Sequence, residues 1–334
     1  MPRHKRINLP GGIHHVIVRG HNRQEIFLGE RDRHDFLGRL EQALLQTGCQ
    51  CLAWALLPNH FHLLIRTGSK PLGDLMRKIL SGYAVSFNRR HQRGGYLFQN
   101  RYKSILCQEE SYLLELVRYI HLNPVRSATV KSIEELDRYT WSGHSVLIGL
   151  RRRSWQERTA VLCRFGANNQ EAIRRYRQFI IDGFQLGKQA DLTSGGYLRG
   201  RSGWEGVNLS HSDEEHMPGD ARILGDNQFV TRALQAAEEE ISQKTQLAQN
   251  GWDLERLVTE VCAMLGVPSV DLQKKGRANN LSLAKGTICF LGYSQLGISG
   301  TVLADYFNIS RASISKAIQR GEKFVTNNRI KLLS

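Results

Sequence analysis

The chain has 334 residues, which exceeds one ordinary domain and suits two or three. Its 41% content of hydrophobic residues can form a buried core and excludes a disordered chain. No apolar run approaches the roughly 20 residues of a membrane span, and the basic start lacks a signal peptide's apolar core, so a cytoplasmic protein is expected. The net charge of +15 favours a polyanionic partner, although many basic proteins bind none.

The first part of the chain predicts alternating strands and helices. Strands are expected over 12–20, 51–57, 60–66 and around 102–106, and helices over 30–46, 72–90 and 109 to about 122. Pro124 disfavours a helical Asn123, so the last of these helices should end there. The order β-α-β-β-α-β-α matches, in its first six elements, the ferredoxin-like arrangement. This predicts an α+β fold with an antiparallel sheet and helices on one face.

Composition predicts four segments along the chain. Residues 1–150 form the first domain, and 151–195 form an amphipathic helical extension that begins at an arginine triplet. Residues 196–228 are rich in glycine, serine and charge, which indicates a linker. Helical patterns return over 229–334, which predicts an all-α second domain.

His60 and His62 form a His-x-His pair on the third predicted strand. Residues two apart on a strand point to the same face, so both imidazoles should lie on one surface. Such a pair is half of a metal site. A bare His-x-His is nevertheless more often two half-exposed polar residues, and a metal would need further ligands.

Tyr119 and Asn123 lie four residues apart on the helix that begins at Glu109, so they should be neighbours on one helix face. Tyr119 could present a phenol as a nucleophile while the Asn123 amide oxygen faces the metal. Taken alone, Tyr119 is better explained as a core aromatic residue. Its combination with the histidine pair is what favours a reactive role.

Two stretches resemble the signature motifs of the REP-associated tyrosine transposases, in the single-tyrosine HUH superfamily. They are Pro58-Asn59-His60-Phe61-His62-Leu63-Leu64 and Tyr119-Ile120-His121-Leu122-Asn123-Pro124-Val125. Three further segments fit the same pattern: Arg19-Gly20-His21-Asn22-Arg23-Gln24-Glu25-Ile26-Phe27, Phe98-Gln99-Asn100-Arg101-Tyr102-Lys103 and Tyr139-Thr140-Trp141-Ser142. The resemblance covers residues 8–150, with one departure at His21, where the family often has asparagine.

The resemblance implies an enzyme that cuts single-stranded DNA, often beside a hairpin. Tyr119 would be the nucleophile, and His60, His62 and Asn123 would hold Mg²⁺ or Mn²⁺. The products would be a 5′-phosphotyrosine and a strand with a free 3′-OH. Attack by the 3′-OH of a second strand could reverse the reaction. Related enzymes act as dimers or monomers, so a homodimer is one of two expected states.

Several basic and polar side chains are candidates for contacts with DNA phosphates. Such contacts supply most of the affinity in protein–DNA complexes. In the first domain these candidates are Arg19, Asn22, Arg23, Arg101 and Lys103. The alternative for each is ordinary solvated surface charge.

Residues 300–320 have helix-turn-helix form, with an apolar helix, a short turn at 308–310 and a polar-faced second helix. Residues Arg311, Ser313, Ser315 and Lys316 should point outward near the start of that second helix, where base edges are read. With Asp271-Leu272-Gln273-Lys274-Lys275-Gly276-Arg277, the region resembles the DNA-binding domain of the bacterial replication initiator. This implies binding to duplex DNA, and a helical hairpin for protein contact is the alternative.

Three functions stay open from the sequence. The first is a metal-dependent DNA nickase and strand transferase with a tyrosine nucleophile. The second is a non-catalytic DNA-binding regulator on a transposase scaffold. The third is a metal-dependent hydrolase that uses water, which would form no covalent adduct with DNA.

Overall fold

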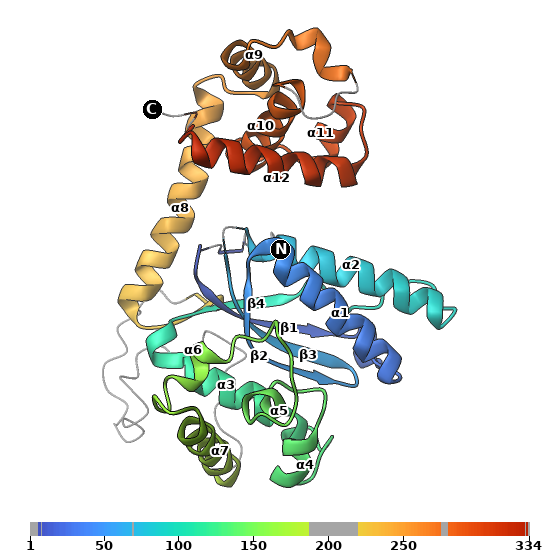
Figure 1. The fold of residues 1–334 in the computed structure, drawn as a ribbon, viewed down its shortest axis with the longest axis vertical. Coiled ribbons are helices and arrows are strands. Elements are labelled where there is room, and N and C mark those ends of the chain that lie inside the picture. Colours follow the sequence, from blue (N-terminus) through green and yellow to red (C-terminus); the bar gives the residue numbers. More distant parts are fainter. Residues whose placement is uncertain are drawn as a thin grey trace. The chain divides into compact units, whose positions relative to one another are not determined.

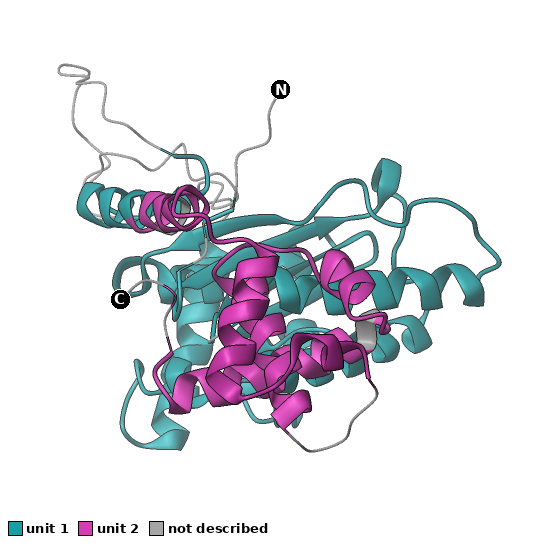
Figure 2. Ribbon diagram, turned by 90° about the horizontal axis from the view of Figure 1, so that it is seen from above, with its two compact units in different colours: residues 1–235 teal, residues 236–334 magenta. Residues whose placement is uncertain are grey.

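In a computed structural model, the described residues are 6–7, 9–68, 70–186, 220–274, 280–330 and 332. The chain forms two compact units, residues 1–235 and 236–334, which Figure 2 colours separately. The division falls inside a helix rather than at the predicted boundary between 228 and 229. Residues 196–219 of the predicted linker lie outside the described residues.

The first unit is a mixed α/β structure built on a five-stranded sheet. Its strands are β1 (Ile13–Arg19), β2 (Gln50–Leu57), β3 (His60–Arg66), β4 (Lys103–Cys107) and β5 (Ile223–Leu224). They lie in the order β2-β3-β1-β4-β5, with β1 antiparallel to both β3 and β4 and β2 antiparallel to β3. The first four strands fall close to their predicted ranges.

The helices of this unit follow the strands in the expected order. After the short 3-10 helix η1 (His21–Arg23) come α1 (Glu30–Thr47), α2 (Leu72–Arg90), α3 (Glu109–Arg126), α4 (Ile133–Arg138), α5 (His144–Leu147), α6 (Thr159–Leu162) and α7 (Asn169–Gln185). In the described part of the predicted extension, residues 151–186, α6 and α7 are separated by residues 163–168, and residues 187–195 lie outside the described residues.

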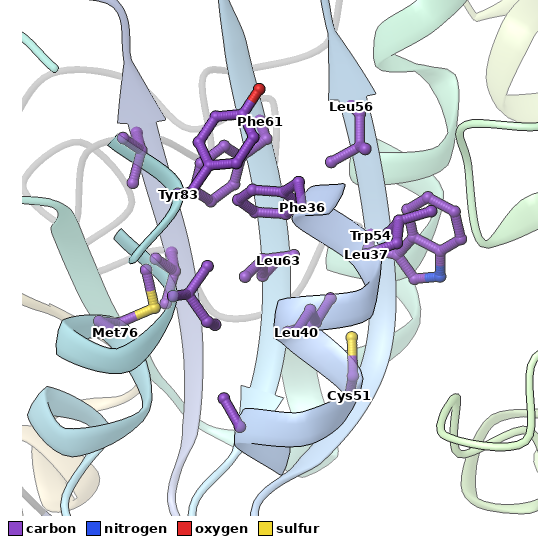
Figure 3. Packing of buried hydrophobic residues seen from close by; sticks show 14 of the residues in the cluster. Phe36, Leu37, Leu40, Cys51, Trp54, Leu56, Phe61, Leu63, Met76 and Tyr83 are labelled. Carbon is purple, nitrogen blue, oxygen red and sulfur yellow. The ribbon is translucent and has the colours of Figure 1, made fainter. Parts of the chain in front are cut away.

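Helices cover both faces of the sheet: α1 and α2 lie on one face, and α3 and the helices that follow it cover the other face, which the prediction of helices on one face did not include. α1 and α2 pack with Trp54, Phe61 and Leu63 on one face, where Figure 3 shows their interlocking side chains. The opposite face of the same strands is also apolar, and its residues, such as Ala53 and Leu64, pack with α3 and the helices that follow it. Figure 1 shows these two groups of helices on either side of the sheet. A strand that is apolar on both sides needs a cover on both sides.

α3 continues to Arg126, past the end predicted at Asn123. Pro124 has no N–H and cannot donate to the Ile120 carbonyl, but it stands in the last turn. The Asn123 carbonyl still accepts from the Ser127 amide at 2.9 Å, and Pro124 O accepts from Thr129 N at 2.8 Å. The loss of one hydrogen bond so near the end is therefore tolerated.

β5 lies within the segment predicted to be a linker. Ile223 and Leu224 are buried and pair in parallel with Leu106 and Cys107 at the edge of the sheet. The sequence pattern missed this strand because two residues are too few to show a period.

The second unit is helical. It contains most of α8 (Asn227–Gln249), followed by α9 (Leu254–Leu265), the 3-10 helix η2 (Ser269–Gln273), α10 (Asn280–Ser294), α11 (Gly300–Tyr306) and α12 (Arg311–Asn327). Gly286 of α10 faces Gly321 of α12 so closely that a Cβ on Gly321 would collide with the Gly286 carbonyl. Among the described residues, no helix combines the length and the apolar character that crossing a membrane requires.

Candidate active site

β3 carries His60 and His62 on the side of the sheet that α3 covers. The intervening Phe61 points to the opposite face, into the cluster formed with α1 and α2. The two imidazole centroids lie 5.2 Å apart. His62 is buried and His60, at the start of the strand, is half-buried. The period of the strand therefore brings both imidazoles to one surface.

His15 of β1 joins this pair, and the sequence interpretation missed it. Its Nε2 lies 3.0 Å from His62 Nδ1, and the two buried rings stack with centroids 5.2 Å apart. β1 and β3 are neighbours in the sheet, and Ile17 of β1 stands opposite His62. The alternating pattern of β1 could have predicted that His14 and His15 face opposite ways, but not that β1 would lie beside β3.

Tyr119 of α3 packs against these histidines. Its ring centroid lies 5.9 Å from that of His62 and 5.8 Å from that of His15, both in edge-on geometry. The Tyr119 side chain is half-buried at the edge of the cluster beneath α3. α3 therefore faces the strand that carries the histidine pair.

Asn59 forms a hydrogen bond with the imidazole of His60. Its Oδ1 lies 2.7 Å from His60 Nδ1, while its Nδ2 donates to the Arg23 carbonyl oxygen at 3.2 Å. The turn between β2 and β3 is thereby tied to η1. His60 and His62 each have a hydrogen-bond partner at Nδ1.

Both imidazoles are held in the uncharged form. Burial, reinforced by the nearby Arg19 cation, lowers the pKa of His60 to about 4. Burial also lowers the pKa of His62 well below its usual value, and His15, His60 and Arg19 add to the shift. Neutral imidazoles keep a nitrogen lone pair at neutral pH, which metal coordination requires.

Asn123 lies one helical turn beyond Tyr119, and its Nδ2 donates to the Tyr119 carbonyl oxygen at 2.8 Å. This places the amide nitrogen on the helix backbone and leaves Oδ1 as the side-chain atom suited to a cation. Among the described residues, no group of three or more His, Cys, Asp and Glu side chains is arranged to hold a metal ion. A metal here would therefore need ligands of other kinds beside the two imidazoles.

Arg126 is a second residue that the sequence interpretation missed. Its guanidinium carbon lies 5.3 Å from the centroid of the Tyr119 ring, two helical turns further along α3. Burial lowers the pKa of Arg126, and the Tyr119 hydroxyl opposes that shift. The cation stands where negative charge on the phenol oxygen or on a bound phosphate would be stabilised.

A buried network of polar side chains connects α3 to α7, α5 and α4. The Tyr176 hydroxyl of α7 lies 2.8 Å from His121 Nδ1 and 2.8 Å from His144 Nδ1, while His144 Nε2 lies 2.8 Å from an Asp137 oxygen. Because the carboxylate only accepts, His144 Nε2 donates to it, and Tyr176 then donates to His144 Nδ1 and accepts from His121. The network ties α7 of the predicted extension to the helix that carries Tyr119.

Replacing Tyr176 with Phe should destabilise this unit. The change would leave a buried donor on His121 and a buried acceptor on His144 without partners, at about 1–3 kcal/mol for each group. Urea unfolding of the variant would measure the loss of free energy. The matched control is Tyr96→Phe, since Tyr96 is 85% exposed and should tolerate the change. Equal stability of the two variants would contradict the network's role.

The predicted DNA-contacting residues of the first unit occupy two places. Arg19 ends β1 directly opposite His60, and Asn22 and Arg23 form η1 beside it. Arg101 and Lys103 instead contribute to a separate cavity of about 350 Å³, which Arg6, His14, Tyr102 and Arg222 also line. The His14 ring and the Tyr102 hydroxyl each present there a buried polar atom, Nε2 and Oη, that has no hydrogen-bond partner within the described part of the chain.

A family model matches part of the first unit. Residues 11–123 match the model of the IS200-like transposases. This segment is similar to the IS200-like transposases. The match begins just before β1 and ends at Asn123, so it includes His15, His60, His62 and Tyr119.

Solved structures resemble this chain only distantly. One is a REP-associated tyrosine transposase bound to a REP hairpin, with 19% identity, a TM-score of 0.38, and coverage of 47% of this chain and 98% of its own. Another is a candidate transposase from Deinococcus radiodurans R1, with 19% identity, a TM-score of 0.26, and coverage of 36% and 94%. A search of curated proteins found no match. With TM-scores this low, the assignment depends on the family model.

Proposed function

We propose that the chain is a metal-dependent DNA nickase and strand transferase that acts on single-stranded, hairpin-associated DNA. The observation that carries the proposal is the cluster of Tyr119 with His15 and His62, whose ring centroids lie within 5.9 Å of the phenol ring. This chemistry needs a phenol and uncharged imidazoles close together, and Tyr119 packs against His62 while burial keeps His60 and His62 uncharged. The sheet order β2-β3-β1-β4 fits the ferredoxin-like arrangement expected of such enzymes.

Tyr119 is the nucleophile in this proposal. Its oxygen attacks the phosphorus of a DNA phosphodiester, and the bond from phosphorus to the 3′ oxygen breaks. The products are a 5′-phosphotyrosine and a strand with a free 3′-OH, which takes up the proton. Attack by another 3′-OH restores the phosphodiester and releases Tyr119, so the bond energy is kept and no nucleotide cofactor is required.

His60, His62 and the Asn123 Oδ1 would hold a divalent cation, Mg²⁺ or Mn²⁺. A tyrosine hydroxyl has a pKa near 10 and is a weak nucleophile at neutral pH without help. The bound cation would align the phosphate and offset its developing charge. Imidazole nitrogens suit Mn²⁺, or even Zn²⁺, better than Mg²⁺, which prefers oxygen.

Basic side chains around the sheet suit the DNA strand. Arg19 stands beside His60, and Arg126 stands over Tyr119, so both can reach a phosphate at the reacting atoms. The cavity lined by Arg101 and Lys103 offers a second contact for the backbone, away from the nucleophile. The net charge of +15 supports the same partner.

The test is a nicking assay on the full chain. Labelled single-stranded oligonucleotides with hairpins should yield a denaturant-resistant protein–DNA adduct and a strand with a free 3′-OH. Product should appear with Mg²⁺ or Mn²⁺ and disappear with EDTA. DNA binding without nicking under either cation would favour the non-catalytic regulator, and nicking without an adduct would favour the hydrolase.

The second unit is proposed to bind duplex DNA through α11 and α12, as a domain of the replication-initiator type would. Ser310 caps α12 by accepting from the Ser313 amide at 3.2 Å, and Ile314 and Ala317 bury one face of the helix. Ser313 and Lys316 stay exposed, and Ser315 is half-buried. The Arg311 side chain lies outside the described residues.

Replacing Lys316 with Gln should weaken duplex binding. If Lys316 contacts one phosphate, the slope of log K against log salt should fall by about one. Fluorescence anisotropy over a salt series would measure this. Lys323→Gln is the matched control, since it removes the same charge further from the start of α12, where such helices meet DNA. Equal effects of the two changes would contradict the proposed orientation.

A further inference from the structure

The two imidazoles at the proposed metal site are held in the same way. His60 Nδ1 lies 2.7 Å from Asn59 Oδ1, and His62 Nδ1 lies 3.0 Å from His15 Nε2. In both rings the nitrogen nearer the backbone is engaged by the protein. Nε2 is then the ring nitrogen left for a cation in each case.

The donor at His60 follows from the orientation of Asn59. The Asn59 Nδ2 donates to the Arg23 carbonyl oxygen, so the atom that faces the histidine is the amide oxygen, which only accepts. His60 Nδ1 must therefore carry the proton. A neutral imidazole carries one proton, so His60 Nε2 presents its lone pair.

The contact between His15 and His62 joins two ring nitrogens, of which one must donate. Both side chains are at most 2% exposed, so no bulk water competes for the contact. The rings are nearly parallel, at 24°, and both belong to neighbouring strands of the sheet, which fixes their separation. If His62 Nδ1 donates, its Nε2 lone pair is presented like that of His60; if His15 donates, His62 Nε2 is protonated and cannot bind a metal.

We propose that His15 and Asn59 are positioning residues that hold His62 and His60 with their Nε2 lone pairs toward the divalent cation. The inference depends on the proposed metal site and adds the residues that orient its ligands. A partner that accepts a hydrogen bond from the second ring nitrogen of a ligand histidine commonly contributes roughly 10- to 100-fold in metal affinity. His15 also touches the Tyr119 ring, so it lies between the ligand and the nucleophile.

Binding of Mn²⁺ to the full chain, measured by electron paramagnetic resonance of the free ion, tests the role of His15. His15→Leu should weaken binding by roughly 10- to 100-fold, because His62 loses its acceptor. His15→Gln should stay close to wild type, because the Gln side-chain oxygen can accept where His15 Nε2 does. His14→Leu is the matched control, since His14 is an equally buried neighbour whose ring lies 3.2 Å from Ser104 Oγ, away from His62.

Three results would overturn the inference. Wild-type affinity in His15→Leu would show that the contact does not matter. An equal loss in His15→Gln and His15→Leu would make His15 a direct ligand. If His14→Leu lost as much Mn²⁺ affinity as His15→Leu, the loss would be explained by general destabilisation of the fold. Failure of the wild-type chain to bind Mn²⁺ would instead remove the proposed metal site itself.

The unmutated protein offers a second test that does not depend on the variants folding. Nitrogen-15 NMR of labelled histidines separates the two neutral tautomers directly. In the metal-free chain, His60 and His62 should both carry their proton on Nδ1. A proton on His62 Nε2 would contradict the inference.

Discussion

Replacing Tyr119 with Phe is expected to abolish covalent protein–DNA adducts on single-stranded substrates. The change removes only the hydroxyl oxygen that would form the bond to phosphorus. The ring can keep its edge-on contacts with His15 and His62, so the fold and the proposed metal site should survive. Denaturing gels of reactions with end-labelled oligonucleotides would measure the adduct, while DNA binding should stay near its wild-type level.

Tyr112→Phe is the matched control for that experiment. Tyr112 lies on the same helix, is also half-buried, and packs against the same apolar cluster. It should form adducts at the wild-type rate. Adducts that persisted in Tyr119→Phe would mean that another residue is the nucleophile, and nicking that continued without adducts would support a water nucleophile.

Replacing His60 with Ala is expected to remove most of the nicking activity. His60 is half-buried at the start of β3, so its loss should disturb the core less than loss of the buried His62. A cation on a phosphoryl oxygen supplies several kcal/mol in such transition states, which corresponds to roughly 100- to 1000-fold in rate. Single-turnover nicking at a fixed concentration of Mn²⁺ would measure the loss.

Raising the Mn²⁺ concentration should partly restore the His60→Ala variant if the defect is in metal binding. The exposed histidine of α1, His34, provides the control, since His34→Ala should leave the rate unchanged. A rate in His60→Ala that matched the wild-type rate, or nicking that resisted EDTA, would contradict a metal held by this histidine.

Local patterns predicted much of the architecture around the site. The range of β3 and its period of two placed His60 and His62 on one face, and helical spacing placed Tyr119 beside Asn123. These predictions depended only on backbone geometry within one element. The extent of α3 was less predictable, because a proline in the last turn removes one hydrogen bond without ending the helix.

Contacts between elements could not be read from those patterns. His15 meets His62 only because β1 lies next to β3, which is a property of strand order in the sheet. Tyr176 meets His121 across 55 residues, and α3 covers the sheet face opposite α1 and α2 because the strands are apolar on both sides. Such partners depend on the tertiary arrangement, so the local patterns assigned no role to His15 or Tyr176.

The central claim is that Tyr119 forms a covalent bond to the 5′ phosphate of cleaved DNA when a divalent cation is bound. Peptide mapping by mass spectrometry tests it most directly, on wild-type protein trapped with a single-stranded hairpin substrate and then digested. The account predicts a nucleotide 5′-phosphate on the peptide that contains Tyr119, present with Mn²⁺ and absent with EDTA. Attachment to another residue, or through the 3′ phosphate, would contradict it.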